Sequence, residues 1–218
     1  MIKLRLRNVK NAKSIIEECE YVVKWSSETL KGNWESIFGN SNPIHLEIGM
    51  GKGKFIHEMA KNNPNINFIG VEKYESVLVR AVEKVNKDPL PNLRLLCVDA
   101  LNLPDIFNHE IDCIYLNFSD PWPKTRHAKR RLTSPIFLDI YENIFVDEIM
   151  GGEKRIIQKT DNLILFASSL KNLNNYGYTF DDVSLDLAST EIPNVETEYE
   201  TKFKKQGIKI NYLNASKK

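Results

Sequence analysis

The chain has 218 residues, of which 42% are hydrophobic and 27% charged, and its formal net charge at pH 7 is +1. This is an ordinary globular composition, and the length allows one substantial hydrophobic core. No apolar run approaches the roughly 18 residues that span a bilayer, and the basic start MIKLRLRNVKNAK is not followed by the apolar core of a signal peptide. These features argue against a membrane protein and predict a cytoplasmic one.

The three cysteines, Cys19, Cys97 and Cys113, lie far apart and form no Cys-x-x-Cys pair. None of them lies beside a histidine that could complete a metal site. We therefore expect reduced thiols, mostly buried, and no metal centre.

Residues 1–40 are predicted to form a mostly helical extension ahead of a main domain at 41–218, in a chain that is a single domain overall. Trp25, Trp34 and Phe38 can pack this extension on the core. Its first residues carry cations and no acid: Lys3, Arg5, Arg7, Lys10 and Lys13. A nucleic-acid contact and an ordinary solvated surface both remain open for this basic segment.

From Ile44 onward, short β-branched or apolar runs alternate with helical stretches, which predicts an α/β fold with a parallel sheet covered on both faces. Strands are expected at Ile44 to Gly49, Asn67 to Glu72, Leu93 to Val98, Ile111 to Phe118 and Arg155 to Lys159. Helices are expected at Lys54 to Asn62, Glu75 to Lys87, Pro135 to Phe145 and Asn162 to Asn175. After Tyr176 the pattern weakens, and it suggests a strand from Tyr178 to Leu187, a loop near Pro193, a short charged helix and a last strand from Ile208 to Leu213.

A glycine-rich loop follows the first predicted strand, in HLEIGMGKGKFI. Gly49, Gly51 and Gly53 let the backbone turn sharply at the carboxyl end of the strand, where open α/β sheets bind their ligands. A nucleotide-like cofactor is therefore predicted, although glycines also serve ordinary tight turns. The spacing Gly-x-Gly-x-Gly differs from the Gly-x-Gly-x-x-Gly of dinucleotide dehydrogenases. Glu47, just before the loop, would repel a pyrophosphate but attract a sulfonium or an amino group.

Acidic residues also end the next strands. Glu72 can accept hydrogen bonds from both hydroxyls of a ribose. Asp99 can accept one from an adenine amine, or it can simply cap a helix. Together with Glu47 and Asp120, these acids converge on one crevice if their strands are adjacent.

The fourth strand leads into IYLNFSDPWPKTRHAKRRLTSPIFLDIY, which resembles the bacterial tRNA (guanine-N7-)-methyltransferase family closely. The match runs from LRLRN near the start to TEYETKF near the end, so it covers nearly the whole chain. The resemblance implies a Rossmann-like class I S-adenosylmethionine-dependent methyltransferase fold, S-adenosylmethionine as methyl donor, and a guanosine in the tRNA variable loop as target. Met50 departs from the family pattern, because residues other than methionine, small ones among them, are usual at this position of the glycine loop.

The resemblance also implies roles for particular residues. The cofactor site would comprise Glu47, Glu72, Asp99 and Asp120 with the glycine loop. The substrate would be bound by Lys124, Asp161, Thr197, Glu198, Tyr199 and Glu200. RNA contacts would come from Lys124, Arg126, His127, Lys129, Arg130 and Arg131.

The residues of these motifs have physical interpretations of their own. Asp120-Pro121-Trp122-Pro123 predicts a stiff turn, because both prolines fix the backbone. Trp122 can stack on a base or pack on the following helix. Asp161 can be the cap of the next helix, and the TEYE segment can be a capped helix start. Our hypothesis is that Asp120 and Asp161 are the catalytic residues.

Two alternatives remain. A non-catalytic RNA-binding module on the same fold would need only the basic run, but not the set of acids at the strand ends. A nicotinamide-dependent dehydrogenase would share the ribose-binding acid, but the loop spacing argues against it. The partner expected is tRNA, with no obligatory protein partner, and the chain is expected to act as a monomer or a homodimer.

Overall fold

The structure is a computed structural model that describes residues 11–25, 30–147 and 154–217. Of the basic residues near the start, Lys13 lies in the first helix, whereas Lys3, Arg5, Arg7 and Lys10 are outside the described residues. Within the described ranges, no helix has both the length and the apolar character that crossing a bilayer requires.

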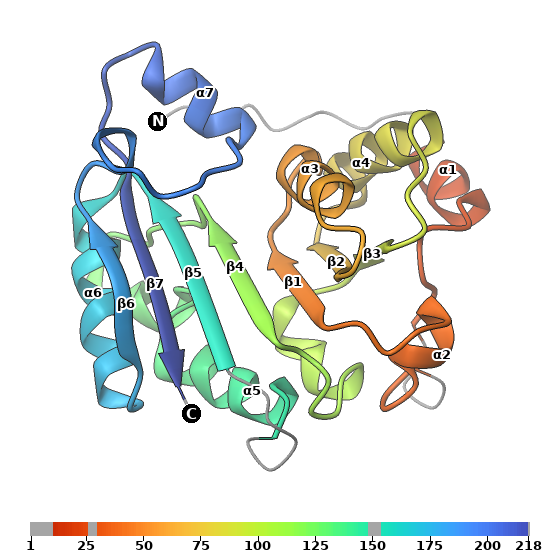
Figure 1. Cartoon of the computed structure of the whole chain (residues 1–218), viewed down its shortest axis with the longest axis horizontal. Coiled ribbons are helices and arrows are strands. Elements are labelled where there is room, and N and C mark those ends of the chain that lie inside the picture. The colour runs from red at the N-terminus through yellow and green to blue at the C-terminus, as the bar shows by residue number, and fades with distance from the viewer. Residues whose placement is uncertain (1–10, 26–29, 148–153, 218) are drawn as a thin grey trace.

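One sheet of seven strands runs through the molecule, in the order β3-β2-β1-β4-β5-β7-β6 (Figure 1). The first five strands pair in parallel, β7 pairs antiparallel with β5, and β6 pairs antiparallel with β7. The strands are β1 Ile44–Ile48, β2 Asn67–Glu72, β3 Leu93–Cys97, β4 Cys113–Asn117, β5 Lys154–Thr160, β6 Thr179–Ser184 and β7 Asn211–Lys217. The strand order reverses between β1 and β4, which is the point where open α/β sheets bind their ligands.

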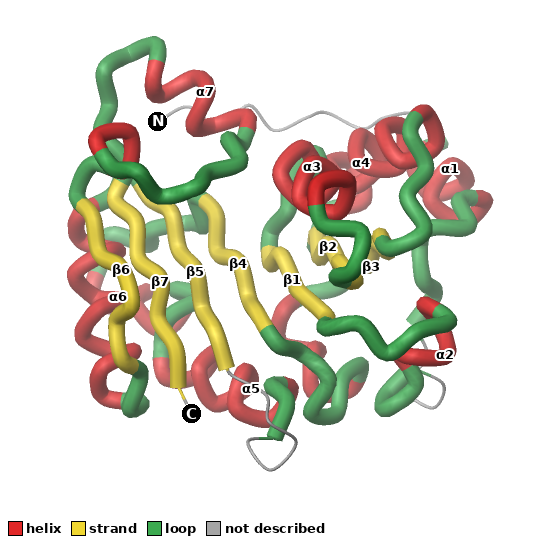
Figure 2. Tube along the Cα trace, viewed as in Figure 1, coloured by secondary structure: helices red, strands yellow, loops and turns green. Residues whose placement is uncertain are grey.

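Helices cover both faces of the sheet, as the sequence predicted (Figure 2). One hydrophobic cluster joins one face to α1, α3 and α4, and a second joins the other face to α5, α6 and the 3-10 turn η1. The helices are α1 Ala12–Glu18, α2 Trp34–Phe38, α3 Lys54–Asn62, α4 Glu75–Lys87, α5 Pro135–Ile144, α6 Leu163–Asn175 and α7 Glu198–Lys204. The 3-10 turns are η1 Ala100–Asp105, η2 Thr125–Arg130 and η4 Leu187–Ser189. In Figure 1, α7 lies across the upper ends of β4 and β5.

The described part of the N-terminal extension packs on this core. Trp34 is fully buried, stacks on Phe107 at 5.1 Å and donates from Nε1 to the carbonyl oxygen of Ile106 at 3.1 Å. Val22 forms a parallel bridge with Leu95, so the segment continues the sheet beyond β3. The extension is therefore held by both apolar packing and backbone pairing.

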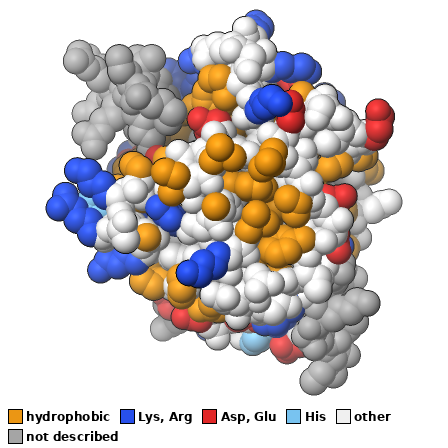
Figure 3. Space-filling view, turned by 90° about the vertical axis from the view of Figure 1, so that its left-hand side faces the viewer, with side chains coloured by type: hydrophobic (Ala, Val, Ile, Leu, Met, Phe, Trp, Pro, Cys, Tyr) orange, Lys and Arg blue, Asp and Glu red, His pale blue; other side chains and the backbone are white. Residues whose placement is uncertain are grey.

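The predicted elements match most closely where apolar periodicity is strong, and the C-terminal region differs. The last strand was predicted to end at Leu213 but runs from Asn211 to Lys217. Because β7 lies between β5 and β6, its polar residues are paired on both sides and the strand does not need a continuous apolar run. Beside it, the edge strand β6 exposes Val183, and Figure 3 shows hydrophobic side chains gathered on this side of the molecule.

Candidate active site

The most buried of the acids that the sequence predicted at the cofactor site is Glu47 on β1, which is only 2% exposed. Asn117 on β4 donates from Nδ2 to Glu47 Oε1 at 2.9 Å, whereas Glu47 Oε2 is buried without a hydrogen-bond partner among the described residues. Burial raises the pKa of Glu47 to about 7, although the bond from Asn117, the charge of Lys159 and the neighbouring backbone amide of Ile56 act in the opposite direction. A buried carboxylate oxygen of this kind suits a cationic donor from a ligand.

The three glycines of the loop have two different tasks. Gly49 and Gly51 have positive φ angles of 78° and 61°, and a Cβ at either position would meet nothing within 4 Å. Gly53 also has a positive φ, but a Cβ there would lie 2.8 Å from Cβ of Ala81 on α4. The sequence interpretation placed Gly53 with the cofactor residues. The structure shows that the close packing of α3 on α4 also requires a glycine at this position, whereas Gly49 and Gly51 lie beside open space.

Glu72 and Asp99 hold the neighbouring strand ends in shape. Glu72 accepts from the backbone N–H of Gly51 at 3.2 Å and of Tyr74 at 3.0 Å, so it links the glycine loop to the end of β2. Asp99 caps η1 by accepting from the N–H of Leu101 at 3.1 Å, and its other oxygen pairs with Lys73 at 2.7 Å. The capping role considered for Asp99 is therefore present, together with a position at the crevice.

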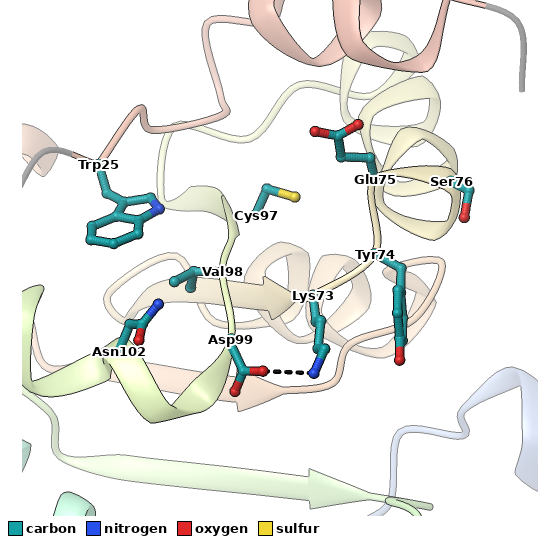
Figure 4. A pocket seen from close by; sticks show the side chains of 9 residues that line it. All are labelled: Trp25, Lys73, Tyr74, Glu75, Ser76, Cys97, Val98, Asp99 and Asn102. Carbon is teal, nitrogen blue, oxygen red and sulfur yellow. Dashed lines mark hydrogen bonds and ion pairs between the residues drawn. The ribbon is translucent and has the colours of Figure 1, made fainter. Parts of the chain in front are cut away.

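These strand ends border a pocket of about 580 Å³. In Figure 4 the rings of Trp25 and Tyr74 lie at opposite ends of this pocket, and the Lys73–Asp99 ion pair lies between them. Cys97, another lining residue, is half-buried, and burial raises the pKa of its thiol to about 11, so it stays protonated. The pocket offers a wall of aromatic, apolar and acidic groups, as a nucleoside needs.

The Asp120 turn follows β4. Asp120 is half-exposed, and residues on both sides of it, Phe118 and Trp122, have positive φ angles of 51° and 40°. The ring of Trp122 lies against His127 at 5.9 Å and below the guanidinium of Arg130 at 4.9 Å. Of the two interpretations of Trp122, the structure therefore favours packing on the following segment.

The basic run forms η2 and its two flanking residues. Lys124, Arg126, Lys129 and Arg130 are exposed and His127 is half-buried, as contacts with RNA require. Arg131 differs from them. It is only 7% exposed, and its guanidinium donates to the carbonyl oxygens of Pro121 and Trp122 at 3.0 and 3.1 Å. Two donor atoms of Arg131, Nε and Nη2, are therefore bonded within the protein, which does not favour the RNA contact that the sequence predicted for this residue.

Asp161 lies between the end of β5 and α6. The cap of α6 is Asn162, whose side-chain oxygen accepts from the N–H of Leu165 at 2.9 Å. The interpretation of Asp161 as the helix cap is therefore wrong, and the carboxylate of Asp161 is available for another role at the carboxyl edge of the sheet.

The TEYE segment combines a helix start with a link to the crevice. Thr197 and Glu200 are buried and form a capping box at the start of α7, as considered from the sequence. Glu198 and Tyr199 are exposed, and Glu198 pairs with Lys52 of the glycine loop at 3.2 Å. The segment therefore splits into two structural residues and two residues that face outward next to the loop.

A buried lysine that the sequence interpretation missed lies beneath α7. Lys159 on β5 is 3% exposed and donates to Glu200 Oε2 at 3.1 Å, to the carbonyl oxygen of Val195 at 2.8 Å and to Asn194. Burial lowers the pKa of Lys159, and the charge of Glu200 opposes that shift. The available signal was a lysine at a position of a central strand that should be buried on both faces.

Comparisons with known proteins agree with this geometry. A family model described as "Putative methyltransferase" matches residues 41–213. The chain is 53% identical over 209 residues to a tRNA (guanine-N(7)-)-methyltransferase of Geobacillus sp. (strain WCH70). The aligned residues cover 95% of this chain and 93% of that relative. It is 51% identical over 213 residues to the enzyme of that name from Lysinibacillus sphaericus, with 96% of each chain covered.

The chain belongs to the tRNA (guanine-N(7)-)-methyltransferase family. Among solved structures, this family member is similar in fold to an antibiotic-related methyltransferase, with a TM-score of 0.64 at 20% identity over 92% of this chain and 98% of the other. It is also similar to the 16S rRNA methyltransferase KamB, with a TM-score of 0.64 at 14% identity over 89% and 94% of the two chains. At these identities the likeness is one of fold, and it confirms the Rossmann-like methyltransferase fold predicted from the sequence.

Proposed function

We propose that the chain transfers a methyl group from S-adenosylmethionine to N7 of a guanosine in tRNA, and that this guanosine lies in the variable loop. The family assignment supports the reaction and the cofactor. The observation that carries the proposal at the level of the site is the unpartnered buried oxygen of Glu47 beside the open glycine loop. A non-catalytic RNA-binding module would have no use for that oxygen.

The residues of the crevice fit the three parts of this cofactor. Glu47 can accept a hydrogen bond from the amino group of the methionine part. Glu72 can accept hydrogen bonds from the ribose hydroxyls, and Asp99, which lines the pocket, can accept one from the adenine amine. Gly49 and Gly51 leave room for the part of the cofactor that joins its amino group to the ribose. We therefore assign Glu47, Glu72, Asp99 and the two glycines to cofactor binding.

The chemistry requires placement more than proton transfer. When bound, S-adenosylmethionine supplies an electrophilic methyl group, and guanine N7 has an in-plane lone pair and no proton, so the site needs no general base. We assign Asp161 to the Watson–Crick edge of guanine, where its carboxylate accepts from N1–H and the exocyclic amine. These hydrogens become more acidic as positive charge develops on the ring, so this contact strengthens toward the transition state. We place Asp120 beside the transferred methyl.

RNA would be held by the exposed cations around η2 and by the outward face of α7. Lys124, Arg126, Lys129 and Arg130 can each neutralise a phosphate, with His127 beside them. Glu198 and Tyr199 can contact the substrate next to the glycine loop, whereas Thr197 and Glu200 would act by shaping the start of α7. No obligatory protein partner is proposed for the reaction, in which the chain acts as a monomer or a homodimer.

The test is to incubate the purified chain with labelled S-adenosylmethionine and unmodified tRNA, to digest the RNA and to identify the methylated nucleoside. N7-methylguanosine from the variable loop is expected, and RNA binding without methyl transfer would support the non-catalytic alternative instead. Asp161→Asn should lower the single-turnover rate far more than the cofactor affinity. At saturating cofactor, the wild-type rate should stay nearly flat between about pH 6.5 and 8.5, because no general base is required.

A further inference from the structure

The backbone around Asp120 is held in an uncommon conformation. Phe118 and Trp122, two residues before and two residues after Asp120, both have φ angles in the left-handed region, at 51° and 40°. Bulky residues rarely adopt this region, and they stay there only when their surroundings enforce it. A turn of this kind needs contacts that hold it from both sides.

On the first side, the contacts come from α7. The ring of Phe118 stacks on Tyr199 at 6.1 Å and lies 5.7 Å from Phe203, and the N–H of Phe118 donates to the carbonyl oxygen of Lys159 at 2.9 Å. The entry into the turn is therefore fixed by packing and by one backbone hydrogen bond to β5.

On the second side, the contacts come from Arg131. Its Nε donates to the carbonyl oxygen of Pro121 at 3.0 Å and its Nη2 to that of Trp122 at 3.1 Å. The planar fork of a guanidinium suits two consecutive carbonyl oxygens, and the bonds are strengthened by the charge of the donor. Arg131 thus spans the peptide units that join Pro121 to Trp122 and Trp122 to Pro123.

The position of Arg131 sets it apart from the rest of the basic run. Arg126, Lys129 and Arg130 are exposed, whereas Arg131 is 7% exposed and ends η2 with its backbone N–H bonded to the carbonyl oxygen of Ala128 at 3.0 Å. A guanidinium that is buried to this extent, and whose Nε and Nη2 already bond to carbonyl oxygens, is poorly placed to bind a phosphate. The residue is nevertheless covalently continuous with the segment that carries the exposed cations.

We infer that Arg131 is a positioning residue of the methyl-transfer site, which fixes the backbone after Asp120 through the carbonyl oxygens of Pro121 and Trp122, and that it is not one of the RNA contacts. The inference rests on the proposed function, because it assigns Asp120 to the reacting centre. Through η2, Arg131 also connects the exposed phosphate-binding cations to the backbone of the Asp120 turn.

The test separates charge from position by comparing three variants with the wild-type chain. Arg131→Gln removes the charge, Arg131→Lys keeps the charge but loses the fork, and Lys129→Gln removes an exposed charge of η2 as the matched control. Two quantities are measured for each: the single-turnover rate of methyl transfer at saturating tRNA and cofactor, and the dependence of tRNA affinity on salt concentration. Thermal melting and cofactor affinity report whether each variant is folded.

Arg131→Gln should lower the saturated rate by about ten- to a hundredfold, the scale expected for a misplaced reacting group, and should keep the wild-type salt dependence. Lys129→Gln should flatten the salt dependence by about 0.7 to 0.9 log units for each phosphate that the variant no longer neutralises. A flattened salt dependence with an unchanged saturated rate in Arg131→Gln would overturn the inference, and so would no change in either quantity.

If Arg131→Gln does not fold, the Arg131→Lys variant tests the positioning role instead. A reduced rate with an unchanged salt dependence supports the positioning role, whereas a wild-type rate overturns it, because a phosphate contact tolerates lysine. If the wild-type chain itself forms no N7-methylguanosine, the proposed function fails. If the wild type is active and both Arg131 variants match it, only the inference about Arg131 fails.

Discussion

Two ion pairs, one lining the pocket beside β3 and the other beneath α7, have surroundings that differ sharply. Lys73 and Asp99, on the cofactor side, pair at 2.7 Å with side chains that are 55% and 34% exposed. Lys159 and Glu200, beneath α7, pair at 3.1 Å with side chains that are 3% and 7% exposed. Water can replace either partner of the first pair, but not of the second. We therefore expect the α7 side to depend on its ion pair for folding, and the cofactor side to use its acids for binding.

The largest effect expected from this contrast concerns Lys159. Lys159→Met leaves Glu200 buried without its cation, and removing one partner of a buried pair costs about 3–5 kcal/mol. The free energy of unfolding, from urea denaturation at pH 7, should fall by that amount.

Lys159→Met combined with Glu200→Gln is the control. The double variant should recover part of the loss, because no uncompensated buried charge remains. The opposite outcome is a double variant whose free energy of unfolding falls by the sum of the two single losses. It would show that the two side chains do not act as a pair.

The next effect concerns cofactor binding through Glu72. Glu72→Gln keeps the shape of the side chain but removes the charge that would receive the ribose hydroxyls. Affinity for S-adenosylmethionine should fall by about 1.5–3 kcal/mol, as for hydrogen bonds to a charged group. Calorimetric titration measures it, and thermal melting tests whether the glycine loop is still held through Gly51. Unchanged affinity in a folded variant would remove Glu72 from the cofactor site.

The contrast between the two sides also explains what could be predicted from sequence. On the side that we assign to the cofactor, β2, α3 and α4 have the predicted bounds, and Glu72 ends β2 as predicted. These features depend on local patterns, namely apolar periodicity and a glycine turn after a strand. Met50, which departs from the family pattern, is accommodated because its sulfur fills the space that a side chain on Gly70 would occupy.

The other side depends on contacts between distant segments. Lys159 and Glu200 meet because α7 folds back over β5, and no local pattern encodes that approach. Arg131 follows Lys124 and the three lysine or arginine residues of the short turn η2, where no periodicity indicates which side chain points inward. The direction of a charged side chain depends on the hydrogen-bond acceptors around it. For Arg131 these are the carbonyl oxygens of Pro121 and Trp122, and only the folded backbone brings both of them within its reach.

A smaller effect follows from the buried acid Glu47. Burial raises its pKa from 4.5 to about 7, so the folded chain binds this proton more tightly than the unfolded chain does. The contribution of Glu47 to stability is therefore fully present below pH 4.5 and is lost as the pH rises to about 7. A cationic amino group needs the ionised form, so cofactor affinity should rise with pH up to about 7.

Above about pH 8 the affinity should fall again, because the α-amino group of the cofactor then loses its own proton. Calorimetric titration from pH 5.5 to 9, as an approximate range that spans both transitions, measures the profile. Glu47→Gln is the control, since it should abolish the rise toward pH 7 and retain the fall. An unchanged rise in Glu47→Gln would assign it to another group.

The smallest effect concerns Lys73, and it tests the other half of the comparison. The Lys73–Asp99 pair is exposed, so Lys73→Met should change the free energy of unfolding by no more than about 1 kcal/mol. Asp99 keeps its bond from the N–H of Leu101, so η1 should remain capped. The released oxygen of Asp99 is then open to the adenine amine, and cofactor affinity should change by less than about tenfold, which corresponds to about 1.4 kcal/mol.

Denaturation and titration of Lys73→Met beside Lys159→Met give both numbers under one set of conditions. A loss of stability in Lys73→Met as large as that in Lys159→Met would mean that exposure does not distinguish the two pairs. The division into a binding side at the pocket and a folding side beneath α7 would then be wrong.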